Sequence, residues 1–111
     1  MSHNFVLAAT RHSAFGRLLT LSVAGQPPRR FTEQEASIVA RALAAVVAGR
    51  SAEEQIYMSP IASDREFSAS VEKGGVVVRL EGCADVALDW AETLELAREM
   101  ACFGSDRSEA K

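Results

Sequence analysis

The sequence is short of the side chains that carry metal and nucleophilic chemistry. Its 111 residues include two histidines and two cysteines. His3 and His12 stand in no spacing with cysteines or carboxylates that is typical of a metal site. Cys83 and Cys102 have only these distant histidines as candidate bases for a nucleophilic thiolate. The one adjacent glycine pair lies in a hairpin signal and not in a phosphate-binding string. We therefore expect a protein that is not an enzyme and that uses no metal and no cofactor.

Long hydrophobic runs and a secretion signal are also lacking. The longest uncharged apolar stretch, residues 42–49, is far shorter than a membrane span. The first residues, MSHNFVLAATRH, have no basic lead followed by an apolar core. These absences predict a cytoplasmic chain with no membrane partner, in which both cysteines remain reduced thiols.

The strongest signal that is present is a helix within residues 31–49, FTEQEASIVARALAAVVAG. Thr32 and Glu35 have the spacing of a capping box, in which each side chain bonds the backbone amide of the other residue. Gly49 follows the last turn, where a left-handed residue ends a helix at low cost. After Glu35, only Ser37 and Arg41 are polar, so we expect this helix to be covered on more than one side.

Small residues recur every four positions along this helix, and an apolar stripe runs beside them. A row of alanines lets another backbone approach closely, and the flanking branched side chains then pack around the contact. We predict that this face meets a second copy of the chain in a symmetric homodimer. The predicted interface residues are Ala36, Val39, Ala40, Leu43, Ala44 and Val47.

Alternating apolar residues and turn signals predict the strands. We place strands at 4–10, 17–23, 66–72 and 76–81, with a tight turn between the last two. Residues 24–30 contain two prolines and are interpreted as a connector. The segment 56–59 is either a short edge strand or an apolar anchor. A second helix is predicted from Asp89, with Glu92 as its box partner, to about Phe103, with Gly104 at its end.

Shifting the second half of the sequence onto the first by 57 residues superposes a strand, a connector and a capped helix. Thr32 and Glu35 then fall on Asp89 and Glu92. The predicted fold is α+β: an antiparallel sheet of four to five strands with two helices on one face, built as two pseudo-repeated strand-strand-helix units. Residues 1–104 form a single domain in this prediction, and residues 105–111 form a flexible polar tail.

Charge is divided unevenly along a chain whose net charge is −3. Residues 1–50 carry six arginines and two glutamates, whereas the remainder is strongly acidic. Arg11, Arg17, Arg29 and Arg30 are therefore candidate contacts for phosphates or for an acidic partner. Nucleic-acid association through these arginines is one alternative function. A small-molecule site between sheet and helices is another, and it requires a pocket with convergent polar groups.

Two observations support the leading hypothesis: the sequence has no recognisable catalytic groups, and its first predicted helix is apolar nearly all round. We expect a small regulator or inhibitor of bacterial or phage type, which works by binding an unidentified protein and associates as a homodimer.

Overall fold

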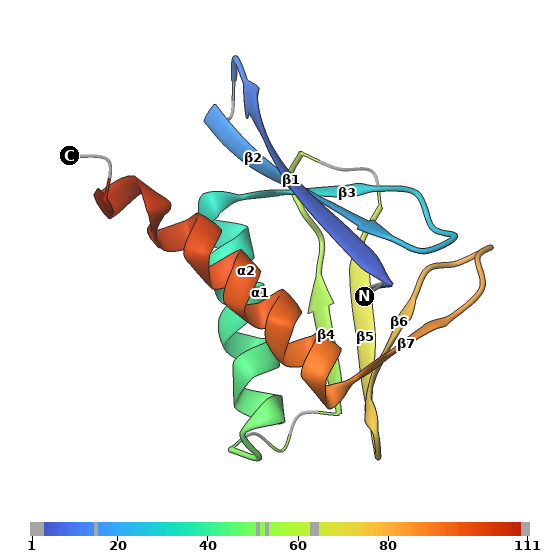
Figure 1. The fold of residues 1–111 in the computed structure, drawn as a ribbon. Helices are drawn as coiled ribbons and strands as arrows, with labels where there is room; N and C mark the ends of the chain where they lie inside the picture. The colour runs from blue at the N-terminus through green and yellow to red at the C-terminus, as the bar shows by residue number, and fades with distance from the viewer. Residues whose placement is uncertain (1–3, 15, 51, 53, 63–64, 110–111) are drawn as a thin grey trace.

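Two antiparallel sheets and two helices make up the fold in this computed structural model (Figure 1). The structure describes residues 4–14, 16–50, 52, 54–62 and 65–109. The predicted α+β class is confirmed. The predicted single sheet is wrong, because the strands of the described chain divide into one sheet of three and one of four. None of the described helices is long and apolar enough to cross a membrane.

The first sheet contains β1 (Phe5–His12), β2 (Gly16–Val23) and β3 (Arg29–Thr32), in that order. The core-facing residues predicted for β2 are confirmed, since Leu19, Leu21 and Val23 are buried; Leu18, on the other face of the strand, is buried as well, so the alternation is not complete. The prediction of a connector over residues 24–30 missed β3, which pairs with Leu18–Leu21 of β2. This strand has only four residues and runs directly into a helix cap, so its own sequence shows too little alternation to reveal it.

The first helix, α1 (Glu33–Val47), begins and ends as predicted. The Thr32 hydroxyl accepts a hydrogen bond from the Glu35 amide at 3.2 Å, and the Thr32 amide donates to Glu35 Oε1 at 2.9 Å. The second carboxylate oxygen of Glu35 accepts from the amide of Ile61 at 2.9 Å. Gly49 adopts φ +72°, which ends the helix in the left-handed region.

The second sheet contains β4 (Gln55–Met58), β5 (Phe67–Glu72), β6 (Gly75–Arg79) and β7 (Val86–Asp89), again in chain order. The alternative left open for residues 56–59 is thereby decided, since β4 is a strand at the edge of this sheet. The β5 and β6 hairpin was predicted. The strand β7 was not predicted, because it has only four residues, like β3, and leads directly into a helix cap.

The second helix, α2 (Trp90–Glu109), has the predicted capping box: the Glu92 amide donates to Asp89 Oδ1 at 2.8 Å and the Asp89 amide donates to Glu92 Oε1 at 3.1 Å. The predicted end at Gly104 is wrong, since the helix continues to Glu109. One interior glycine costs a helix about 1 kcal/mol and does not by itself end it. The flexibility predicted for residues 105–111 stays a prediction, and residues 110–111 lie outside the described residues.

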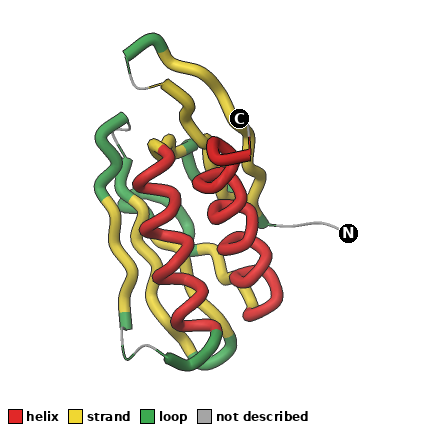
Figure 2. Tube along the Cα trace, turned by 90° about the vertical axis from the view of Figure 1, so that its left-hand side faces the viewer, coloured by secondary structure: helices red, strands yellow, loops and turns green. Residues whose placement is uncertain are grey.

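The two helices lie side by side in one layer, with the strands behind them (Figure 2). Side chains of both sheets and both helices meet in one core, for example Leu21, Leu43, Phe67 and Leu96, each with no exposed surface. The strands β3 and β7 lie 57 residues apart, and each leads directly into a capped helix. The predicted pseudo-repeat is matched only in part, because the halves form separate sheets and β4 has no counterpart in the first half.

Candidate functional site

The predicted interface on α1 is largely covered within one chain. The side chains of Ala36, Val39, Ala40 and Leu43 are at most 3 % exposed, while Ala44 and Val47 are half-buried. The helix packs against α2, and between the two helices a hollow of about 290 Å³ is lined by four alanines: Ala40, Ala44, Ala97 and Ala101. The small residues do admit a neighbouring helix, as predicted, but that helix is α2 of the same chain. Ala44 and Val47 keep part of their surface in solvent, and α1 is most exposed on the side turned away from the core, at Ile38 and Arg41.

The four candidate arginines do not form one surface. Alternate residues of a strand point to opposite faces, so Arg29 is buried while Arg30 is exposed. Arg17 forms an ion pair with Glu33 at 2.9 Å, and its guanidinium lies 4.5 Å from the ring centre of Phe103. Arg11 is exposed on β1. Arg29 is therefore not available to a phosphate, and the adjacent arginine pair predicted from sequence is divided between interior and surface.

Arg29 instead joins the two sheets. Its Nε donates to the carbonyl of Glu66 at 2.6 Å, and one Nη donates to Gln26 Oε1 at 2.8 Å and to the carbonyl of Arg79 at 3.4 Å. The guanidinium also lies 5.7 Å from the ring centre of Phe67. Burial lowers the pKa of Arg29, and the charges of Cys83 and Glu66 oppose that shift. Its Nη1 atom has no hydrogen-bond partner. The bonds reach from β3 to the residue before β5 and to the end of β6, so this arginine is a structural clamp.

Gln26 completes the clamp from the loop before β3. Its side-chain amide donates to the carbonyl of Val78 at 3.1 Å and to that of Ala84 at 2.9 Å, while its oxygen accepts from Arg29. Both polar side chains are buried, and neither could be predicted as buried, because most of their partners are backbone carbonyls distant in sequence.

No cluster that suits a metal or a nucleophile stands out in the described part of the chain. It contains no group of three or more His, Cys, Asp or Glu side chains that could hold a metal ion. Cys83 lies in the loop after β6 and Cys102 on the exposed side of α2, and neither is in a disulfide. Another hollow, of about 610 Å³, lies between β1, β2 and α2, and its charged residues are of both signs.

Exposed large apolar side chains gather where α1 meets β4. Four such residues are found among those described, and three of them lie there: Ile38 at 42 %, Tyr57 at 60 % and Ile61 at 68 % exposed. Ile38 is one turn after Glu35, whose carboxylate holds the amide of Ile61, and both isoleucines are therefore close to the start of α1. Single exposed apolar residues are ordinary, but a group of them marks a contact surface.

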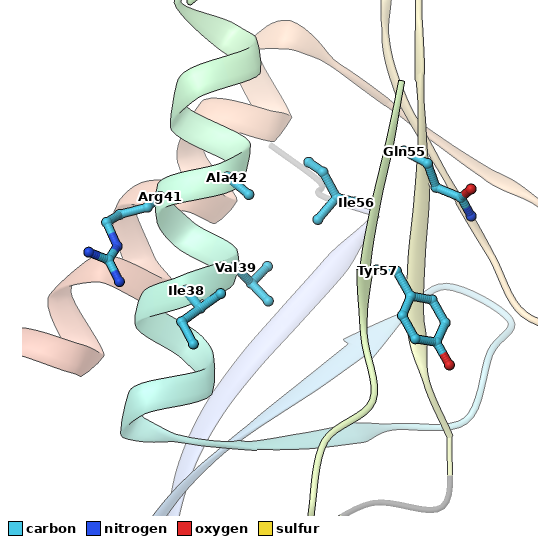
Figure 3. Close-up of a pocket in the computed structure, with 7 residues that line it drawn as sticks. All are labelled: Ile38, Val39, Arg41, Ala42, Gln55, Ile56 and Tyr57. Carbon is cyan, nitrogen blue, oxygen red and sulfur yellow. The ribbon is translucent and has the colours of Figure 1, made fainter. Parts of the chain in front are cut away.

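A hollow of about 410 Å³ lies between α1 and β4, and its lining includes Ile38 and Tyr57 but not Ile61 (Figure 3). Its lining on α1 includes Ile38, Arg41 and Ala42. On β4, Ile56 points toward α1, whereas Tyr57 and Gln55 point to the other side of the sheet (Figure 3). Arg41 lies on the exposed side of α1, and it lines both this hollow and the hollow between α1 and α2. We give the name α1–β4 face to the surface around this sheet edge, which includes residues on both sides of β4: Ile38, Arg41 and Ala42 on α1, Gln55 and Tyr57 on the side of β4 turned away from α1, and Ile61 after the strand.

The sequence contained only part of this face. Because α1 is apolar nearly all round, the pattern could not distinguish the side covered by the core and α2 from the side left in solvent. Predicting that Tyr57 and Ile61 are exposed here requires knowing that β4 lies at a sheet edge, and this position depends on its pairing with β5.

Comparisons of the chain with protein-family models, with curated proteins and with solved structures find no significant match.

Proposed function

We propose that this protein is a non-enzymatic binding module that attaches to another protein through the α1–β4 face. The observation that carries the proposal is a hollow beside the edge strand β4 that is lined by two exposed apolar side chains, Ile38 and Tyr57, with a third, Ile61, exposed near the start of α1. Apolar anchors surrounded by polar groups supply most of the binding energy of protein interfaces. A role as a small cytoplasmic regulator or inhibitor fits such a surface.

The proposal differs from the predicted homodimer in its contact residues. The alanine row of α1 is turned to the core and to α2, so the binding surface is the opposite side of the helix and the strand beside it. Nucleic-acid binding receives no comparable support, because one of the four candidate arginines is buried and another is paired with a glutamate.

Replacing Ile38 by glutamate is expected to weaken binding to the partner. Burying this side chain in a complex contributes about 1 kcal/mol, and a carboxylate in its place must also be desolvated, so the loss of affinity is about tenfold or more. The measurement compares proteins retained from a lysate of the source organism by the immobilised full chain and by Ile38→Glu. Because residue 38 is on the solvent side of α1, the variant should keep its melting temperature within a few degrees.

Val6→Glu is the matched control. Val6 is 66 % exposed on β1, apart from the α1–β4 face, and the same change of chemistry there should leave the retained protein unchanged. A protein retained equally by wild type and by Ile38→Glu would contradict the proposal, as would the loss of binding in both variants. Light scattering of the free chain shows in addition whether a second copy is the partner: twice the chain mass for wild type and a single mass for Ile38→Glu would identify it.

A further inference from the structure

The hydrogen bonding of β4 indicates how the partner binds, and this inference rests on the proposed function. Residues opposite each other in an antiparallel pair alternate between hydrogen-bonded and non-bonded. The Val71 amide donates to the Glu54 carbonyl at 2.9 Å, which makes this pair a bonded one. The register of β4 and β5 then makes Ile56 and Met58 hydrogen-bonded to the residues opposite them on β5. Gln55 and Tyr57 are in non-bonded pairs with β5.

The backbone N–H and C=O groups of Gln55 and Tyr57 therefore point away from β5. Since β4 is the outermost strand of its sheet, these groups face the free edge beside the hollow. Natural sheets usually protect such edges with charged residues or proline within the strand. The strand β4, with the sequence QIYM, has neither, and only its short length limits pairing.

We infer that an extended segment of the partner protein adds to β4 as a fifth strand of the second sheet. Its backbone pairs with Gln55 and Tyr57. Its side chains alternate, as strand residues do, so that one set packs into the hollow on Ile38 and Ala42 while the other set lies beside Tyr57. Main-chain bonds supply affinity in this mode, and the alternate side-chain contacts supply selectivity.

Charge indicates which segment fits. The hollow is lined by one cationic side chain, Arg41, and by no carboxylate. Arg41 forms no ion pair or hydrogen bond with any described residue. Glu54 precedes the strand and Glu35 is engaged in the cap of α1, and neither lines the hollow. The added strand thus carries an acidic side chain on the set that faces α1, where it pairs with Arg41.

The same charge argues against a second copy of this chain as the occupant. A twofold pairing of β4 with itself, through Gln55 and Tyr57, is centred on Ile56. The added segment would then be QIYM, which brings no carboxylate to Arg41, and the hollow of each copy would hold a cationic side chain without a lining carboxylate.

Selection from a phage-displayed library of random peptides of about ten residues, long enough for one strand, tests this inference on the immobilised full chain. The enriched peptides are expected to alternate apolar residues and to carry an acidic residue. Gln55→Pro removes one outward N–H and leaves the backbone bonds to β5 in place, and it should weaken binding of the enriched peptides about tenfold. It also removes the bond that Gln55 Nε2 donates to Ser68 Oγ of β5 at 2.8 Å, and Gln55→Thr removes the same bond. Arg41→Glu should weaken it by a similar factor. Gln55→Thr keeps the N–H and serves as the matched control for the proline variant.

The two proposals fail in different ways. Peptides that lose binding to Ile38→Glu but bind Gln55→Pro and Gln55→Thr equally well would overturn strand addition and leave the α1–β4 face intact. Enrichment of apolar residues at helical spacing would do the same. If no enriched peptide is sensitive to Ile38→Glu, the face itself is not a binding surface and both proposals are overturned. Self-association that is lost in Gln55→Pro would show that the occupant is a second copy.

Discussion

Replacing Arg29 by methionine should lower the free energy of unfolding by about 3 kcal/mol. The change removes the donor for the carbonyls of Glu66 and Arg79 and for the side-chain oxygen of Gln26. A hydrogen bond to a charged group contributes about 1.5–3 kcal/mol, and acceptors left buried without a donor add to the cost. Removing the buried charge offsets part of this loss of stability, since Nη1 has no hydrogen-bond partner and the site is desolvated. The lost hydrogen bonds are expected to outweigh the relief of the buried charge, because the backbone carbonyls that accept them stay in place without a donor.

Urea denaturation measures this effect, with the midpoint shifted and the slope unchanged if only stability changes. Arg30→Met is the matched control: the neighbouring arginine is exposed, and its replacement should alter stability by no more than about 0.5 kcal/mol. Equal midpoints for Arg29→Met and Arg30→Met would show that desolvation offsets the bonds of Arg29, and that the clamp adds nothing to stability.

Replacing Gly75 by alanine should destabilise the protein by about 3 kcal/mol or more, through steric conflict. A Cβ atom at this position would lie 1.9 Å from the carbonyl oxygen of Leu88 and 2.8 Å from Cα of Asp89. Both are backbone atoms of β7, so no side chain can move aside. Gly75 also has φ +155°, which L-residues rarely adopt. Relief would require β6 and β7 to separate, and this would displace Asp89, the cap of α2.

The adjacent glycine provides the control for this substitution. A Cβ at Gly74 would meet no atom within 4 Å, and its φ is not in the positive region, so Gly74→Ala should change the unfolding free energy by about 1 kcal/mol at most. Both variants can be compared by urea denaturation and by circular dichroism. A Gly75→Ala protein as stable as Gly74→Ala would mean that β7 does not lie against Gly75 as described.

Local signals predicted the parts of the fold that depend on local contacts. Both capping boxes and the β5 and β6 hairpin involve residues a few positions apart, and the sequence shows them directly. The division into two sheets depends on β3 and β7, which are short and pass without a break into the caps at Thr32 and Asp89. Pairing partners distant in sequence decide such strands, and one sequence carries little sign of them.

The candidate site was predictable to a similar extent. The composition of α1 correctly indicated a helix with contacts on more than one side. It could not show that the alanine row is turned to the core and to α2, while Ile38 and Arg41 are exposed. The clamp was missed because Arg29 has the sequence appearance of a surface residue beside Arg30. Only the approach of the two sheets buries one of the pair and leaves the other in solvent.

Amide hydrogen exchange along β4, measured by NMR on the full chain with and without the protein that the α1–β4 face retains, is the most direct test of how this protein binds. In the free chain, Ile56 and Met58 are already bonded to β5, whereas Gln55 and Tyr57 face the open edge. Binding is expected to slow exchange at Gln55 and Tyr57 about tenfold and to leave Ile56 and Met58 nearly unchanged. Unchanged exchange at Gln55 and Tyr57 in a saturated complex would contradict strand addition at β4.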